Sequence, residues 1–471
     1  MGGKGFGDAH NVVRNDDAVE VSKPIMSGQW DHQRGVGGCH MKVDRQRFKN
    51  LFVVAGAAIT LVAGMVSTVP SAYAGGTIKV DDDKYISIGM GTRMSFNSIE
   101  DGSASRSQWS NEFAINNARI YINGGIHKYV KFAFNTECFN CAVGQGNGSG
   151  AGAGAAGNIF ASNTTIGLLD AIGQFEFTET VNFWIGRTLV PTERGELNGP
   201  FYHAVFDGFR TPFNQADFSG NIGAGGAGLY GRDNGAVFFG KVHPGGTHLQ
   251  YVLSVFQGLR SGAGTPVVGP NERNSLKYAG RLTWNLLNDE SNPGYYTSGT
   301  YYGTAGDILA LAVGGEYQNA GAGSNLNKSA FGSFVGDVLF EKVLPNKGVF
   351  TANAEYKRYW AQNLAASGDA GCFCMFSGSS VTAYALYLFP NEIGIGRFQP
   401  YGRYTFVNSV HTSALDEFEL GTNYVISGHN ARISAFWRTG SLDPAGGPTT
   451  IGAIQGGRHQ DSVHLALQLQ Y

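Results

Sequence analysis

The sequence has few charged residues and no long stretch rich in alanine, glutamate, lysine and leucine, the residues that favour helices. Charged residues make up only 15% of the 471 positions, whereas 70 positions are glycine and 12% are aromatic. Basic and acidic residues nearly balance, 34 against 36, and no lysine and arginine cluster is interleaved with stacking aromatics, so nothing indicates nucleic-acid binding. These features argue against a helical soluble protein and predict a large all-β protein.

Long apolar runs are also scarce, and the one that stands out lies near the N-terminus. Basic residues that follow Met41 precede an apolar run at 51–66, and a small-x-small site, Ala72-Tyr73-Ala74, comes soon after it. A membrane anchor is the alternative, but the run is short and contains glycine and threonine. The pattern therefore predicts three parts: an upstream extension with a mis-called start at 1–40, a cleavable signal peptide at 41–74, and a single exported domain at 75–471.

The rest of the chain alternates apolar and polar residues in segments of roughly ten, the period of a β-strand. Residues 397–406, for example, place arginine, glutamine and threonine on one face and phenylalanine and tyrosine on the other. Such faces fit either a soluble sandwich or a barrel in a membrane. Short and long connections alternate strictly along the chain, which is typical of a transmembrane barrel and is not expected of a sandwich.

The alternation gives an even number of strands, as single-chain bacterial barrels require. The terminal aromatic, Tyr471, also resembles the assembly signal of outer-membrane barrels. We therefore expect a 16-stranded antiparallel transmembrane β-barrel with short periplasmic turns and long external loops, and an elaborated periplasmic turn at 289–305. The expected strands are 84–96, 113–125, 129–137, 166–177, 181–191, 235–243, 248–259, 276–288, 306–319, 330–342, 348–360, 380–389, 396–409, 416–426, 430–439 and 460–471.

Several short motifs resemble a known family. The run from Asn117 to Gly124, followed by Tyr129-Val130-Lys131-Phe132, is similar to early paired strands of the phosphate-selective porin O and P family of Gram-negative outer membranes. Trp184-Ile185-Gly186-Arg187 and Tyr278-Ala279-Gly280-Arg281 are similar to later strands of that family. The resemblance implies a trimeric 16-stranded pore with a loop folded into the channel and with pore arginines and lysines that guide an anion. This sequence does not match that basic set residue by residue.

The longest connection, 192–234, is rich in aromatic residues that a solvated loop does not need. We expect it to form a constriction loop packed against the inner wall; the alternative is a cap over the barrel mouth or against a neighbouring subunit. The basic side chains and the histidine that we expect to meet solute there are Arg194, His203, Arg210 and Arg232.

The inward faces of the expected strands carry both signs of charge. Ten basic residues against nine acidic ones predict a balanced lumen with only mild ion preference. Arg119, Arg397, Arg403, Arg432 and Arg438 are the best candidates for a basic ladder. The full set of pore-lining candidates is Arg93, Arg119, Lys131, Lys277, Arg281, Lys357, Arg397, Arg403, Arg432 and Arg438, with Glu137, Asp170, Glu176, Glu316, Asp337, Glu341, Glu355, Glu417 and Glu419.

Four cysteines fall in two expected external loops: Cys138, Cys141, Cys372 and Cys374. An oxidising compartment favours disulfides, with a soft-metal site as the alternative, and the pairing is open. We expect no metal, no cofactor and no enzymatic activity, because no serine, histidine and acid are grouped near one rim.

The leading hypothesis is an outer-membrane porin for passive diffusion of small hydrophilic solutes, with anions such as phosphate among them. Its expected partners are outer-membrane lipid, two further copies in a homotrimer, and the solutes themselves. The cysteine-bearing loops keep open the alternative of a barrel that sheathes or scaffolds a partner such as an electron-transfer cytochrome.

Overall fold

A computed structural model gives the structure of residues 76–102, 107–139, 165–208, 231–258, 275–290, 292–323, 328–361, 377–410, 414–442 and 459–471. The expected signal peptide at 41–74 lies outside these described residues, as do Arg210, Cys141, Cys372 and Cys374. No helix in the described part of the chain is long and apolar enough to cross a membrane.

The described residues form one antiparallel sheet of 17 strands. The strands are β1 (Gly76–Lys79), β2 (Tyr85–Ile99), β3 (Ser110–His127), β4 (Val130–Phe139), β5 (Thr165–Glu176), β6 (Asn182–Leu189), β7 (Arg232–Val242), β8 (His248–Phe256), β9 (Lys277–Asn285), β10 (Ile308–Gly323), β11 (Lys328–Val343), β12 (Val349–Ala361), β13 (Gly378–Leu388), β14 (Arg397–Ser409), β15 (Leu415–Ser427), β16 (Ala431–Gly440) and β17 (Gln460–Gln470). Two short helices, α2 (Arg194–Leu197) and η2 (Pro244–Gly246), lie between strands.

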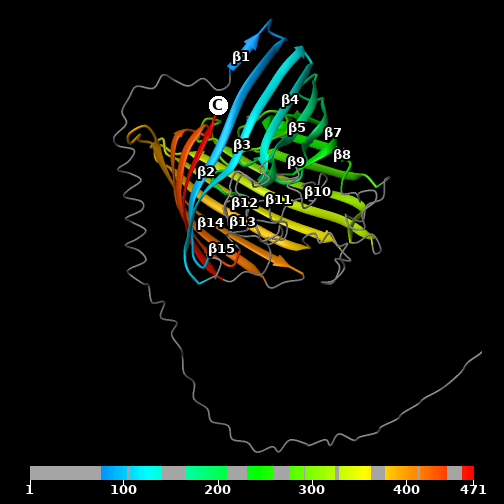
Figure 1. Cartoon of the computed structure of the whole chain (residues 1–471). Coiled ribbons are helices and arrows are strands. Elements are labelled where there is room, and N and C mark those ends of the chain that lie inside the picture. Colours follow the sequence, from blue (N-terminus) through cyan, green and yellow to red (C-terminus); the bar gives the residue numbers. More distant parts are fainter. Residues whose placement is uncertain are drawn as a thin grey trace, which may run out of the picture. The chain divides into compact units, whose positions relative to one another are not determined.

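The sheet closes on itself. Each strand from β2 onward pairs with the next, and β17 pairs with β2, so sixteen strands form a complete barrel (Figure 1). The strand β1 pairs only with the start of β2 and stands outside the closed ring. The fold is therefore the predicted 16-stranded antiparallel transmembrane β-barrel, with β1 as an addition that the alternation did not indicate.

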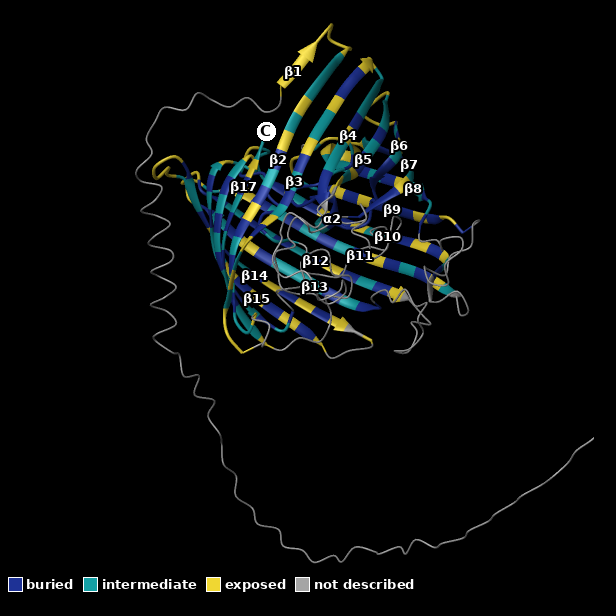
Figure 2. Ribbon diagram, viewed as in Figure 1, coloured by how far each residue is buried: buried dark blue, intermediate teal, exposed yellow. Residues whose placement is uncertain are grey.

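Burial follows the predicted period of two and is inverted relative to a water-soluble protein. In β14, Gln399, Arg403 and Thr405 are buried, whereas Tyr404 and Phe406 are exposed. The same alternation of buried and exposed residues runs along most strands (Figure 2). Polar side chains thus fill the inside of the barrel and apolar side chains cover its outside, as a membrane requires.

Exposed aromatic side chains gather near both ends of the strands. Phe177, Trp284, Phe389 and Tyr471 lie toward the end with short turns, and Phe113, Tyr278, Tyr317, Trp360, Phe406 and Phe418 lie toward the end with long loops. Two aromatic girdles of this kind mark the two membrane–water interfaces of a transmembrane barrel.

One bulge adjusts which side chains face inward. Asn116 has no partner in β2, because Met94 pairs with Ile115 and Arg93 pairs with Asn117. A single extra residue reverses the alternation beyond it. Asn117 and Arg119 therefore both point into the lumen and are buried.

Candidate functional site: a constriction in the lumen

The connection between β6 and β7 enters the barrel. We call residues 190–231 the constriction loop; its described residues, 190–208 and 231, are largely buried. Its backbone receives hydrogen bonds from inward side chains of three strands: Asn423 Nδ2 donates to Ala204 O (2.9 Å), Arg432 Nη1 to His203 O (2.8 Å), and Gln468 Nε2 to Phe201 O (2.8 Å). The described part of the loop thus lies inside the barrel and not over its mouth.

Arg232, which the sequence placed in this loop, is instead the first residue of β7. It pairs with Leu189 of β6, and its guanidinium binds Asp170 on β5 at 2.9 Å. The strand begins earlier than predicted because this ion pair and the ladder with β6 hold Arg232 against the wall.

Arg194 in α2 is the anchor of the loop. Its guanidinium donates to both oxygens of Glu290 at 2.8 Å, and its Nε donates to Asp337 Oδ1 of β11 at 2.8 Å. Arg281 on β9 shares Asp337 through a contact of 2.7 Å. Burial alone would raise the pKa of the Glu290 carboxyl, but the charge and hydrogen bonds of Arg194 outweigh it and hold that pKa below its usual value.

A second segment enters the lumen from the opposite end. Residues 286–307, all described except 291, join β9 to β10 and include the elaborated periplasmic turn expected at 289–305; we call them the inner turn. Tyr295 Oη donates to Leu189 O (2.6 Å), and the backbone N–H of Gly299 donates to Tyr202 O (2.9 Å). Tyr295 is fully buried among Trp184 and Phe239. The inner turn therefore packs inside the barrel against the constriction loop.

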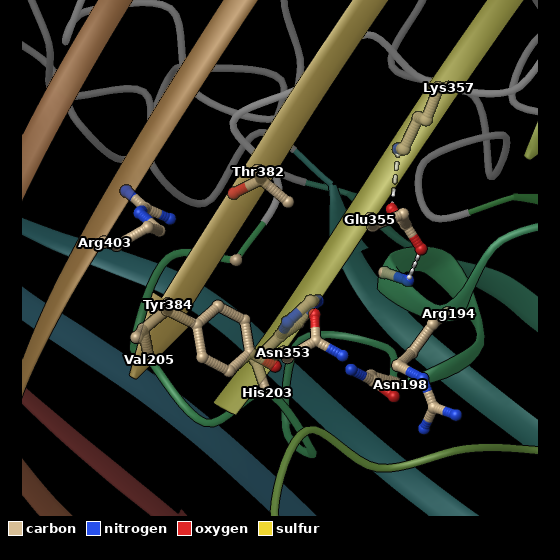
Figure 3. A pocket seen from close by; sticks show the side chains of 12 residues that line it. Arg194, Asn198, His203, Val205, Asn353, Glu355, Lys357, Thr382, Tyr384 and Arg403 are labelled. Carbon is tan, nitrogen blue, oxygen red and sulfur yellow. Dashed lines mark hydrogen bonds and ion pairs between the residues drawn. The ribbon is translucent and has the colours of Figure 1, made fainter. Parts of the chain in front are cut away.

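A polar pocket lies between the constriction loop and strands β12, β13 and β14 (Figure 3). Its enclosed space amounts to about 10 Å³, room for roughly one water molecule. Asn353, which is 6% exposed, has an amide nitrogen without a hydrogen-bond partner in this lining. The lining consists of Arg194, Gly195, Asn198, His203, Val205, Gly208, Asn353, Glu355, Lys357, Thr382, Tyr384 and Arg403.

The charges around the pocket are paired with one another. Lys357 contacts Glu193 of the loop and lies 3.5 Å from Glu355, whose other oxygen accepts a hydrogen bond from the Gly195 backbone at 2.9 Å (Figure 3). On the other side of the pocket, Arg403 contacts Glu419 at 2.6 Å. Three basic residues and one acidic residue line the pocket, and carboxylates outside the lining, among them Glu193 and Glu419, pair with the basic residues.

Most of the other predicted basic residues that face the lumen are also held by carboxylates, whereas Arg93 donates to Asn117 Oδ1 (2.6 Å) and to the backbone oxygen of Phe206. Arg119 contacts Glu137 at 2.5 Å, Lys131 contacts Glu176 at 2.7 Å, and Arg438 contacts Glu419 at 2.9 Å. Lys277 lies between Asp233 (3.2 Å) and Glu316 (3.5 Å), and Arg403 also contacts Glu417 (3.1 Å). The expected basic ladder is therefore largely neutralised by acidic neighbours.

Two residues of the ladder differ from this pattern. Arg432 is fully buried and donates to the carbonyl oxygens of His203 and Ala204, and to Gln468 at 3.2 Å. Arg397 is half-buried at the start of β14, close to the short-turn end. Arg432 thus fastens the constriction loop to the wall.

His203 is buried within the constriction loop, with 3% of its surface exposed. Burial and the nearby positive charge of Arg93 lower the pKa of its imidazole to about 3. The side chain is therefore neutral at physiological pH and adds no charge to the lumen.

Cys138 at the end of β4 is disulfide-bonded, and its partner lies outside the described residues. The remaining predicted cysteines belong to parts of the chain that the structure does not describe.

Sequence reasoning missed the inner turn as part of the site, and with it Glu290; it also missed Glu193. The signal was present: the connection after β9 is long for the short-turn end and contains four tyrosines. The length of this connection indicated an irregular turn, but it did not indicate that the turn points into the barrel.

The chain is similar to several solved outer-membrane proteins. The anion-selective porin from Comamonas acidovorans is 11% identical, with 82% of this chain and 100% of that chain covered and a TM-score of 0.48. The outer-membrane channel DcaP of Acinetobacter baumannii is 13% identical, with 85% and 100% covered and a TM-score of 0.43. OmpT of Vibrio cholerae is 10% identical, with 84% and 100% covered and a TM-score of 0.46. No family model matches the sequence, and no curated protein does.

Proposed function

We propose that this chain is a porin of the outer membrane of a Gram-negative bacterium, through which small hydrophilic solutes diffuse passively without a chemical step. The observation that carries the proposal is the closed barrel with an apolar outside and a polar lumen that the constriction loop narrows. A polar lining gives water and hydrophilic solutes a path that the lipid does not, and a narrowing limits their size.

The pocket between the constriction loop and β12–β14 is the proposed place where solutes pass the narrowest part. Its amide, hydroxyl and charged side chains can replace hydration for a small polar solute.

We further propose that ion selectivity is weak. A strong preference for anions, phosphate included, needs rings of unpaired cations along the path. Most of the arginines and lysines described in the lumen contact a carboxylate, so the field runs across the pore from base to acid. Arg432 is fully buried behind the constriction loop, so it adds at most a mild anion preference.

The assembly and export of the protein are proposals from the sequence alone. We propose export through the signal peptide at 41–74 and assembly into homotrimers. N-terminal sequencing of the mature protein tests the first, with Gly75 as the expected first residue. The mass of the detergent-solubilised protein tests the second.

Single-channel recording in planar bilayers tests the proposed function. The refolded wild-type barrel should give stable conductance steps, a reversal potential close to zero in a potassium chloride gradient, and no block by phosphate. A reversal potential that indicates strong anion selectivity, together with block by phosphate, would contradict a general pore and show an anion-specific one. Folded barrels that carry no current would overturn the pore and favour a sheath for a partner protein.

A further inference from the structure

One carboxylate of the barrel wall holds the inner turn through three hydrogen bonds. Glu341 of β11 accepts hydrogen bonds from the Thr300 hydroxyl (2.7 Å) and from the backbone N–H groups of Tyr301 (3.0 Å) and Gly303 (2.8 Å). Glu341 is fully buried, so these three bonds form where water does not compete for them. The inner turn is therefore held firmly against β11.

The same segment holds the constriction loop. Glu290 binds the guanidinium of Arg194 through two parallel hydrogen bonds of 2.8 Å, a geometry that fixes both position and orientation. The Thr297 hydroxyl donates to Asn198 Oδ1 at 2.8 Å. Tyr301 Oη donates to Glu290 at 2.7 Å and orients the carboxylate in turn. A chain of contacts thus runs from the wall through the inner turn to the loop.

The residues held in this way line the proposed solute path. Arg194 and Asn198 both belong to the pocket lining (Figure 3). Tyr384, which lines the pocket from β13, donates a long hydrogen bond of 3.5 Å to Gly299 O of the inner turn. The inner turn therefore borders the pocket from the short-turn end.

We propose that the inner turn is a second constriction element, and that Glu290 is the positioning residue through which it sets the size limit and ion preference of the pore. This inference rests on the proposed function, since it names what controls the same path. Glu290 acts through Arg194: it keeps that guanidinium turned toward the inner turn and neutralised.

Loss of the Glu290 charge leaves Arg194 with Asp337, which Arg281 already shares. A buried cation that loses one of two carboxylates is stabilised by moving toward water. The nearest open space is the pocket, so Arg194 would add positive charge to the solute path and the loop would loosen.

The test compares Glu290→Gln with Asp289→Asn. Asp289 is the preceding acidic residue; it is 28% exposed at its side chain and contacts Lys241, not Arg194, so it matches the charge change without the positioning contact. Single-channel conductance, the reversal potential in a potassium chloride gradient, and liposome swelling with sugars of increasing size are measured for both and for the wild type. Heat-modifiable migration on gels confirms folding.

Glu290→Gln should shift the reversal potential toward anion selectivity and admit larger sugars, while Asp289→Asn should match the wild type. Equal behaviour of Glu290→Gln and the wild type would overturn the inference, as would an equal shift in both variants. If Glu290→Gln does not fold, Thr297→Val is used; it should admit larger sugars with an unchanged reversal potential, and a wild-type size limit would count against the inference.

Hydrogen exchange separates this inference from the proposed function. The backbone amides of Leu197 and Asn198, which close α2, should exchange faster in Glu290→Gln than in Asp289→Asn, whether or not the barrel conducts. If the wild-type barrel carries no current but these amides exchange faster in Glu290→Gln, the positioning role of Glu290 is supported and the pore is overturned. If the wild-type barrel conducts but exchange in Glu290→Gln is unchanged, the pore is supported and the positioning role is overturned.

Discussion

Most charged side chains described inside this barrel form ion pairs, and the sequence alone does not reveal which residues pair. Glu419 is fully buried and contacts both Arg403 (2.6 Å) and Arg438 (2.9 Å). Burial of a charge costs free energy unless an opposite charge lies close to it. In a lumen partly filled by protein, buried charges are therefore stable in clusters of both signs. A single carboxylate between two guanidinium groups is therefore a sensitive position.

We predict that Glu419→Gln destabilises the barrel by about 3 kcal/mol, because it leaves two buried guanidinium groups with reduced compensation. The freed charge should also move the reversal potential toward anion selectivity. Urea unfolding in lipid vesicles and bilayer recording measure the two effects. Asp416→Asn, an exposed position on the same strand, is the control and should change neither. An unfolding free energy equal to that of the wild type would show that Arg403 and Arg438 do not depend on Glu419.

His203 gives a pH dependence whose sign follows from its environment. Its pKa is about 3 in the folded protein, and it is about 6.5 in an unfolded chain. The folded state therefore binds fewer protons, so the stabilisation is present above the unfolded pKa and is lost as pH falls toward 3, at up to about 1.4 kcal/mol per pH unit.

We predict that His203→Gln reduces the loss of unfolding free energy between pH 6.5 and 4, compared with the wild type. Urea unfolding in vesicles at a series of pH values measures the slope. His459→Gln, at an exposed position, should keep the wild-type slope. Identical slopes in the wild type and His203→Gln would contradict the depressed pKa.

At the scale of elements, the strands were predictable and the inner turn was not. Strand alternation is local, because the two faces of one strand meet lipid and lumen directly, and all sixteen barrel strands overlap their predicted ranges. The inner turn depends instead on Glu290 meeting Arg194, which lies 96 positions away in the chain. No local pattern encodes a contact across the lumen, so the turn could be recognised as irregular but not as part of the site.

The outward faces of the strands allow a test of the membrane-facing surface. Val313 lies near the middle of β10 and is 50% exposed, whereas Val242 lies at the short-turn end of β7. We predict that Val313→Arg destabilises the barrel by about 2–4 kcal/mol in lipid vesicles and Val242→Arg by about 0–1 kcal/mol, because a charge costs most at the bilayer midplane. Equal costs at both positions would contradict the assignment of the two girdles to the membrane interfaces.

For the whole molecule, the closed wall and the two segments inside it have separate roles. Sixteen strands close the wall, which provides the span and the polar interior. The constriction loop and the inner turn enter from opposite ends and meet through Arg194 and Glu290. We propose that this meeting point narrows the pore and that solutes travel through the lumen past this meeting point.

Neighbouring cysteine substitutions on β12 test this path through the lumen. Asn353 faces the pocket, and Ala354 faces outward on the same strand. The current through each variant and through the wild type is recorded before and after a charged, water-soluble thiol reagent, with modification checked by mass spectrometry. We predict that the reagent reduces the current through Asn353→Cys and leaves the currents of Ala354→Cys and the wild type unchanged. An unchanged current through fully modified Asn353→Cys would contradict a solute path through this pocket.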